Sequence, residues 1–363
     1  MSDDLFNTQK PLVVADQGCF HVGGRYVDTA SGRIMAGQMF VQYQIPAQQT
    51  HPYPLVMIHG GGQTGVNFLG TPDGRRGWMD YFVANGYATY VVDQPGRGRS
   101  GFFGAAYGAS TIRGPDSVAE RFTAPERSKL WPQAGLHTQW PGDGIEGDAA
   151  FDHFFATQVE SMNDVGAGEQ MMREAGSALL DRIGPSILLT HSQSGPFGWT
   201  IADARPRLVK GIVAVEPNGA PVYELKFTGP PDYFEDEKMT RPWGITRNAL
   251  TFSPAAASAD EMRFVKQEKP DGDGLVCCWL QAGPARQLPN LKGIPILMVT
   301  AEASYHAPYD HCTSLFLKQA GVEHTFVRLA DVGIRGNGHM VMLEKNNLEI
   351  ARYFDQWLKA NVK

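Results

Sequence analysis

The feature that most constrains the fold is a recurring unit in which a short apolar run ends abruptly in a Gly-rich or polar turn. Such runs occupy residues 55–58, 88–92, 187–190, 212–215, 294–299 and 324–329. Continuous apolar runs with β-branched residues suit strands that are covered on both faces. Because helix-like segments separate many of these runs, the pattern predicts an α/β fold with a doubly wound, mostly parallel sheet.

Regions outside this pattern complete the expected architecture. Residues 18–48 alternate polar and apolar side chains around several glycines, which predicts an N-terminal antiparallel hairpin. Residues 169–183 and 347–358 carry apolar residues at three- and four-residue spacing, which predicts helices that pack on the sheet. We therefore expect a sheet with a hairpin at its N-terminal edge and helices on its faces.

Two long segments do not fit the strand–helix rhythm. Residues 100–160 and 220–290 are rich in Gly, Pro and aromatic residues. Loops of this length within a compact domain usually serve as lids or binding loops. We expect a single domain over residues 1–363, with an insertion at about 100–160 and the main cap at about 220–290.

Composition narrows the partners and the compartment. Hydrophobic residues make up 42% of the 363 residues, and the net charge of −6 comes without a basic cluster, so nothing indicates a nucleic-acid partner. No apolar run approaches the roughly 18 residues that a membrane span needs. Residues 1–5 are acidic and precede no apolar stretch, so we expect no secretory signal and a cytoplasmic protein.

The cysteines indicate the same reducing compartment. They are Cys19, Cys277, Cys278 and Cys312. Because they are few and scattered for a chain of this length, they predict no disulfide framework. The adjacent pair at 277 and 278 is expected as two free thiols in a buried or cap segment.

Several weaker signals receive structural interpretations. His306 and His311 lie near Cys312, but no complete metal-ligand set accompanies them, so we expect no metal. No phosphate-binding glycine motif is present, and no cofactor is expected. Arg97 and Arg99 lie in a turn after an apolar run and could bind an acidic group, but they are expected to be salt-bridged loop residues.

The most informative motif surrounds Ser192, directly after the apolar run 187–190. A strand, a tight turn and a helix entry form the context of a nucleophile elbow, which lifts a serine hydroxyl above the sheet and aims the N–H of Gln193 at the same space. Thr190 and Ser194 occupy positions where glycine is usual, so we expect a tight turn and a strained Ser192 backbone. Ser194 is the competing nucleophile, but it would place a proline at the crowded position two residues later.

A glycine run, Gly60-Gly61-Gly62, follows an apolar run and His59. Backbone N–H groups without side chains can converge on one point and stabilise an oxyanion. We assign Gly61 as the main donor and Gly62 as the next, together with the N–H of Gln193. The alternative is a flexible turn without a catalytic role.

His339 is the best-placed general base, because it lies in a Gly-rich loop between the last apolar run and the C-terminal helix. A carboxylate must orient its imidazole. Glu216 ends the apolar run after the elbow, Glu302 ends the following run, and Asp310 is a more distant candidate. We favour Glu216, whose place between Ser192 and His339 gives the Ser–acid–His order of such enzymes, and keep Glu302 as the alternative acid.

Together these motifs resemble the α/β-hydrolase superfamily across residues 50–360. More narrowly, Ser-Gln-Ser-Gly at 192–195, Val-Glu-Pro at 215–217 and Gly-Asn-Gly-His-Met at 336–340 are similar to those of a small group of bacterial carboxylesterases. The resemblance implies a Ser-Glu-His triad with the glutamate after the sixth strand, which is Glu216 here. It does not extend to the cap and therefore implies no particular substrate.

These residues predict a serine hydrolase that cleaves a carboxylic ester or a lactone through an acyl-enzyme. The aromatic insertions favour a small substrate with an apolar or aromatic part, and a homodimer is left open. One alternative is a C–C bond hydrolase, or another non-ester reaction, on the same triad. A second alternative is a non-catalytic ligand-binding protein built on the fold.

Overall fold

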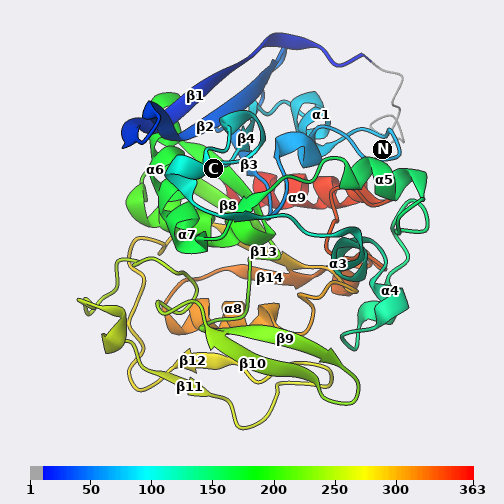
Figure 1. Ribbon diagram of the computed structural model, residues 1–363, viewed down its shortest axis with the longest axis vertical. Coiled ribbons are helices and arrows are strands. Elements are labelled where there is room, and N and C mark those ends of the chain that lie inside the picture. The colour runs from blue at the N-terminus through cyan, green and yellow to red at the C-terminus, as the bar shows by residue number, and fades with distance from the viewer. Residues whose placement is uncertain (1–10) are drawn as a thin grey trace.

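The computed structural model describes residues 11–363 and has an eight-stranded sheet at its centre (Figure 1). The strand order is β1-β2-β4-β3-β7-β8-β13-β14. Its parallel part consists of β3 (Leu55–Ile58), β4 (Thr89–Asp93), β7 (Ser186–His191), β8 (Val209–Val215), β13 (Ile296–Thr300) and β14 (Thr325–Arg328). Each of the apolar runs singled out in the sequence coincides with one of these strands, which confirms the predicted α/β sheet.

β1 (Val14–Thr29) and β2 (Gly32–Pro46) form the predicted antiparallel hairpin at one edge of the sheet. β2 attaches this hairpin to the sheet by pairing antiparallel with β4. Most of β1 is exposed, whereas Met39, Phe40 and Val41 of β2 are buried. The hairpin therefore contributes to the core mainly through its second strand.

Side chains of the central strands alternate between two apolar cores, one on each face, because successive residues of a strand point in opposite directions. In β8, Val213 and Val215 join one core, and Ile212 and Ala214 join the other. The first core is covered by α1 (Trp78–Ala84) and α9 (Asn347–Asn361), and the second by α6 (Val165–Ile183) and α7 (Gly195–Ala204). α8 (Asp310–Gln319) contributes buried side chains to both.

The two long segments form small elements outside the main sheet. The first contains α2 (Gly104–Tyr107), β5 (Ser110–Thr111), α3 (Pro115–Val118), α4 (Pro125–Ser128) and α5 (Ala149–Phe155), and β6 (Ser161–Met162) follows it. The second contains two hairpins, β9 (Tyr223–Gly229) with β10 (Tyr233–Met239) and β11 (Phe264–Lys266) with β12 (Trp279–Gln281). Figure 1 shows both hairpins at the end of the molecule that also carries α8.

Short helical turns complete the chain. Single 3₁₀ turns occupy Gly65–Phe68, Gly98–Ser100, Ala134–Leu136, Ser192–Ser194, Ala259–Glu261 and Leu329–Val332, and a π-helical turn occupies Ala119–Thr123. The turn at Ser192–Ser194 joins β7 to α7, which is the strand–turn–helix order expected there. No helix within residues 11–363 combines the length and hydrophobicity that crossing a membrane requires. The expectation about residues 1–5 lies outside the described residues.

The cysteine prediction is wrong for one pair. Cys278 and Cys312 form a disulfide with their Cα atoms 5.1 Å apart, whereas Cys19 and Cys277 are free. The partners are separated by 34 residues in sequence, and only the packing of the segment before β12 against α8 brings them together. The spacing of the cysteines along the chain does not indicate this contact. Disulfides of this kind persist in oxidising compartments.

Gly195 provides a test of how the strand–turn–helix unit packs. A Cβ at Gly195 would lie 2.4 Å from the Cα of Pro217, and backbone atoms cannot move aside without shifting the turn. Gly195→Ala should therefore lower the free energy of unfolding by about 1–3 kcal/mol, measured by urea denaturation. Gly104→Ala is the control, since its Cβ would meet nothing within 4 Å, and it should stay within about 0.5 kcal/mol of wild type. Equal stability of the two variants would contradict this packing.

Candidate active site

Ser192 lies at the tight turn between β7 and α7. Its φ of 55° places it in the left-handed region, which costs a non-glycine residue roughly 1–3 kcal/mol and is typical of strained functional positions. The strained backbone expected from the sequence is therefore present. The residue is largely buried, yet it lines a cavity of about 230 Å³.

Ser194, the competing nucleophile, has a different role. Its hydroxyl donates to the Ile58 carbonyl oxygen at 2.7 Å and accepts from the His191 N–H at 2.7 Å. The side chain is fully buried and connects the turn to the neighbouring strand β3. A hydroxyl committed in this way is a structural link rather than an accessible nucleophile.

A carboxylate and an imidazole meet next to Ser192. His339 Nδ1 lies 2.5 Å from Glu216 Oε2, and both side chains are buried. The Glu216 carboxylate also accepts hydrogen bonds from the Ala301 N–H at 2.8 Å and from the Ser304 hydroxyl at 2.7 Å. Burial raises the pKa of the Glu216 carboxyl, whereas these two hydrogen bonds oppose that shift. The carboxylate is thus fixed in one orientation toward the imidazole.

The other two acid candidates have other partners. Glu302 pairs with Arg335 Nη1 at 2.8 Å and accepts from the Gly336 N–H at 2.8 Å. Asp310 contacts His306 Nδ1 at 2.8 Å and accepts from Thr300 Oγ1 at 2.6 Å. Among residues 11–363, neither carboxylate forms a hydrogen bond with His339, so geometry favours Glu216 over both.

Tyr305 occupies the space between the serine and the base. Its hydroxyl lies 3.4 Å from His339 Nε2 and also interacts with the Ser192 side chain. Across the described part of the chain, no direct hydrogen bond joins Ser192 to His339. Catalytic hydrogen bonds are often long or misaligned before substrate binds, so this arrangement is compatible with a serine–histidine pair.

Two further histidines flank the His339 ring. His191 lies 4.5 Å from it between ring centroids, and His306 lies 4.9 Å away with only 10° between the planes. Burial lowers the pKa of His339 well below its ordinary value, and the neighbouring histidines act in the same direction. The guanidinium groups of Arg113 and Arg121 add to this effect. At neutral pH the imidazole is therefore uncharged and able to accept a proton.

The glycine run packs directly against the elbow. A Cβ at Gly60 would lie 3.1 Å from the Ser192 Cβ, and one at Gly61 would lie 3.4 Å from the Gln193 Oε1. Gly61 and Gln193 line the same cavity as Ser192. Gly62 has a φ of 74°, a conformation that favours glycine. The structure thus brings together the residues assigned from the sequence to an oxyanion site.

The two arginines of the turn after β4 differ from each other. Arg99 forms the expected salt bridge, with its Nε 2.8 Å from Asp93 Oδ2. Arg97 is buried without an acidic partner in the described residues, and its Nη2 donates to Gln193 Oε1 at 3.2 Å. Burial lowers the pKa of Arg97 to about 10, so its guanidinium remains charged at neutral pH. The expected salt bridge is therefore wrong for Arg97.

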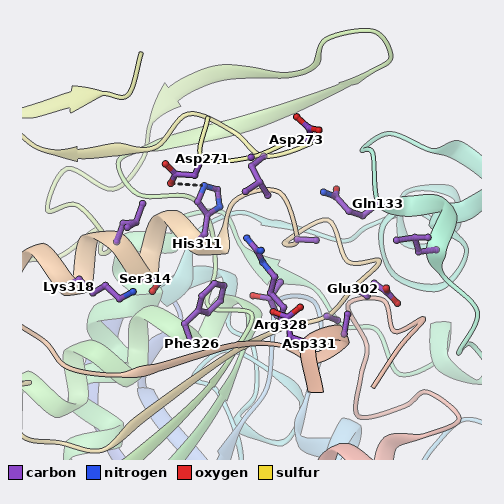
Figure 2. Close-up of a pocket in the computed structure, with 18 residues that line it drawn as sticks. Gln133, Asp271, Asp273, Glu302, His311, Ser314, Lys318, Phe326, Arg328 and Asp331 are labelled. Carbon is purple, nitrogen blue, oxygen red and sulfur yellow. Dashed lines mark ion pairs between the residues drawn. The ribbon is translucent and has the colours of Figure 1, made fainter. Parts of the chain in front are cut away.

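A larger cavity lies elsewhere. Figure 2 shows it between α8 and the loops that follow β13 and β14, with a volume of about 600 Å³. Its lining mixes acidic residues such as Asp271 and Asp331 with the basic Lys318 and Arg328. Neither Ser192 nor His339 lines it, so size alone does not identify the reactive site.

Two side-chain groups within residues 11–363 have the spacing of metal ligands. One is Cys278, His311 and Cys312, and the other is His191, Glu216 and His339. The two sulfurs of the first group are bonded to each other, which leaves no free thiolate. In the second, the carboxylate faces the imidazole Nδ1, as an orienting acid faces a base.

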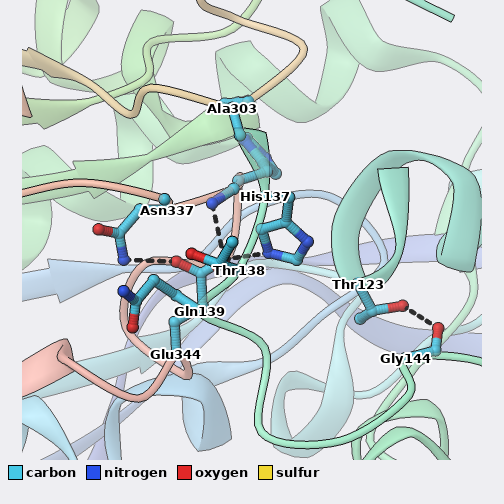
Figure 3. A network of polar contacts seen from close by, with 12 residues as sticks. Thr123, His137, Thr138, Gln139, Gly144, Ala303, Asn337 and Glu344 are labelled. Carbon is cyan, nitrogen blue, oxygen red and sulfur yellow. Dashed lines mark hydrogen bonds and ion pairs between the residues drawn. The ribbon is translucent and has the colours of Figure 1, made fainter. Parts of the chain in front are cut away.

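Glu344 fixes the loop that carries His339. Its carboxylate accepts from the Gly338 N–H at 2.7 Å and from Asn337 Nδ2 at 2.6 Å (Figure 3). His137, from the insertion, contacts Glu344 through Nε2 and Glu126 through Nδ1, both at 2.9 Å. Burial lowers the pKa of His137, but the hydrogen bonds to the two carboxylates outweigh it and raise the pKa to about 9. A charged imidazole therefore holds the insertion to the His339 loop.

Sequence reasoning missed Tyr305, Arg113 and Arg121, and it considered His306 only as a possible metal ligand. None belongs to a recognisable motif, and the two arginines come from the irregular insertion. The one available signal was the position of Tyr305, in the loop after β13, where side chains at the carboxyl end of a strand gather near the site. That signal does not distinguish Tyr305 from its neighbours.

Comparisons with known proteins point to the same fold and class of enzyme. No protein-family model matches the chain. A probable secreted lipase, phiG, from Fungal sp. (strain ATCC 74256) is 46% identical over 342 residues, which cover 94% of this chain and 88% of that protein. The solved structure of a novel bacterial esterase is similar with a TM-score of 0.67 and 25% identity, over 98% of both chains.

Fold and site together define an α/β-hydrolase, as the sequence motifs predicted. The chain belongs to the α/β-hydrolase superfamily and, within it, to the family of this fungal lipase.

The comparison also corrects the predicted location. The relative is named a probable secreted lipase, so the expectation of a cytoplasmic protein is wrong. The Cys278–Cys312 disulfide is consistent with this correction, because such bonds are rare in reducing compartments. The sequence argument failed because it treated the cysteines as free and rested on residues 1–5.

The His137 contacts predict a specific pH dependence of stability. Since the folded-state pKa is raised from 6.5 to about 9, the stabilisation is complete below pH 6.5 and is lost as the pH rises through about 9. His137→Asn should remove about 2–3 kcal/mol of this pH-dependent unfolding free energy, measured by urea denaturation between pH 6 and 9.5. His153→Asn, at an exposed position, should keep the wild-type pH profile. Identical profiles for wild type and His137→Asn would refute the charged bridge.

Proposed function

We propose that this protein hydrolyses carboxylic esters through an acyl-enzyme formed on Ser192, with His339 as general base and Glu216 as the orienting acid. The observation that carries the proposal is the 2.5 Å contact between His339 Nδ1 and Glu216 Oε2 beside a cavity that Ser192 lines. Kinship with a lipase and likeness to a bacterial esterase support the class of ester hydrolase. They also favour an enzyme over a non-catalytic binding protein.

In the proposed reaction, His339 Nε2 takes the proton of Ser192 as its oxygen attacks the ester carbonyl carbon. The backbone N–H groups of Gln193 and Gly61, with Gly62 beside them, would stabilise the oxyanion. His339 then gives its proton to the departing alcohol, and the ester C–O bond breaks. A water molecule, deprotonated by the same imidazole, releases the acid and restores the serine.

The Tyr305 hydroxyl would have to move during this reaction. It contacts both Ser192 and His339 Nε2, so a small displacement toward substrate allows the serine to donate directly to the base. The same hydroxyl can then hydrogen bond to the bound ester. Tyr305 is therefore proposed as a positioning residue that keeps the two reacting groups close before substrate arrives.

Both insertions are proposed to cap the site of a single hydrolase domain. The cavity receives Arg121 and Phe122 from the first insertion, and Leu225 and Phe227 of β9 from the second. The aromatic rings favour an apolar or aromatic group near the ester bond. A lactone would follow the same chemistry, because its ring-opening also begins with attack on an ester carbonyl.

Ser192→Ala tests the nucleophile. The variant should lose roughly 10⁴–10⁶-fold in kcat on p-nitrophenyl butyrate and should no longer be labelled by a fluorophosphonate probe. Ser177→Ala is the matched control, since Ser177 is a buried serine of α6 that does not line the cavity. Near-wild-type turnover by Ser192→Ala, or labelling mapped to another residue, would reject Ser192.

A paired comparison of Glu216→Gln and Glu302→Gln tests the acid. Glu216→Gln replaces the carboxylate that faces Nδ1 and should lower kcat by roughly 10³–10⁴-fold. Glu302→Gln alters a carboxylate that contacts Arg335 and the Gly336 N–H and should lower kcat less than roughly tenfold. The reverse order of the two losses would transfer the acid role to Glu302.

A further inference from the structure

The cavity beside Ser192 is lined by positive charge that the proposed mechanism does not use. Arg113, Arg121 and Arg247 line it, and Glu224 is the only carboxylate among its described lining residues. The Glu224 carboxylate is already paired with Arg241, which does not line the cavity, at 3.0 Å. The whole chain carries a net charge of −6, so the positive lining is a local feature rather than a general property of the surface.

The charges of two of these arginines are not neutralised by the protein. Among residues 11–363, Arg113 and Arg121 form no ion pair with a carboxylate. Instead, the Arg113 Cζ lies 5.7 Å from the centre of the Phe122 ring, and the Arg121 Cζ lies 5.4 Å from that of Phe227 and 5.8 Å from that of Tyr305. Aromatic faces hold guanidinium groups by cation–π attraction and leave their N–H donors available for an anion.

These arginines lie close to the reacting groups. The Phe122 ring that contacts Arg113 also stacks on His339, with centroids 5.2 Å apart. The Tyr305 ring that contacts Arg121 carries the hydroxyl 3.4 Å from His339 Nε2. Each arginine therefore contacts an aromatic ring that also contacts the general base. A short substrate chain can span the width of one such ring.

Arg97 adds a further uncompensated charge behind the cavity. Its side chain is buried against Gln193, and within the described chain its Nη1 has no hydrogen-bond partner. A buried cation without an acidic partner is costly unless another group compensates it. An anion in the adjacent cavity would provide that compensation.

We propose, on the basis of the esterase function proposed above, that the substrate is an ester bearing a free carboxylate, which Arg113 and Arg121 bind while Ser192 attacks the ester carbonyl. Arginine is suited to this role because its planar fork matches the two oxygens of a carboxylate. A cavity of about 230 Å³ accepts a short dicarboxylic acid monoester. Hydrolysis adds water across the ester C–O bond and yields the dicarboxylate and the alcohol.

The first test compares two substrates of similar length, the p-nitrophenyl monoester of adipic acid and p-nitrophenyl hexanoate. Wild type should show the higher kcat/KM with the charged ester, and Arg121→Gln and Arg113→Gln should each lower the charged-to-neutral ratio by about 10–100-fold. Arg127→Gln removes an exposed arginine from the same insertion, outside the cavity, and should leave the ratio unchanged. A wild-type preference for the neutral ester, or an unaltered ratio in both cavity variants, overturns the proposal.

A second test measures binding without catalysis. Adipate should bind to the Ser192→Ala protein in calorimetry, more weakly as NaCl is raised, and Arg121→Gln in the same background should weaken it at least tenfold. Absence of binding, or tighter binding of inorganic phosphate than of adipate, overturns the carboxylate assignment. Arginine-dependent adipate binding to a protein that cleaves neither ester would support the anion site and reject the esterase function.

Discussion

The contact between Glu216 and His339 is the interaction on which the organisation of the site depends. A buried carboxylate is stable only when its oxygens are satisfied, and here Ala301, Ser304 and His339 satisfy them together. That requirement fixes the loop after β13 and the loop before α9 with respect to the end of β8. Because Glu216 contacts Nδ1 of His339, Nε2 is the ring nitrogen left to accept a proton from Ser192.

Around this centre, charged side chains hold the irregular segments in place. His137 joins the first insertion to Glu344 and hence to the backbone next to His339. Arg97 joins the turn after β4 to Gln193 beside the nucleophile. Polar groups in the irregular segments therefore help to position the residues that are proposed to react.

Sequence patterns predicted the sheet because its strands are short, continuous apolar runs, and buried parallel strands leave little choice of composition. The elbow at Ser192, the glycine run at 60–62 and the loop of His339 follow from their places after those strands. Tyr305, Arg113 and Arg121 could not be found in this way, since their proximity arises from packing of irregular segments. The Cys278–Cys312 disulfide could not be predicted for the same reason. The cytoplasmic location was inferred partly from cysteines that were taken to be free, and it is wrong.

That disulfide also restrains the second long segment, residues 220–290. It ties the segment leading into β12 to α8, whose first residue, Asp310, is hydrogen bonded to the His306 ring stacked on His339. One end of residues 220–290 is thus covalently attached to the helix whose first residue contacts His306 beside His339. β9 and β10 lie at the other end of the same segment and are not tied by this bond, so the disulfide restrains one end of the segment only.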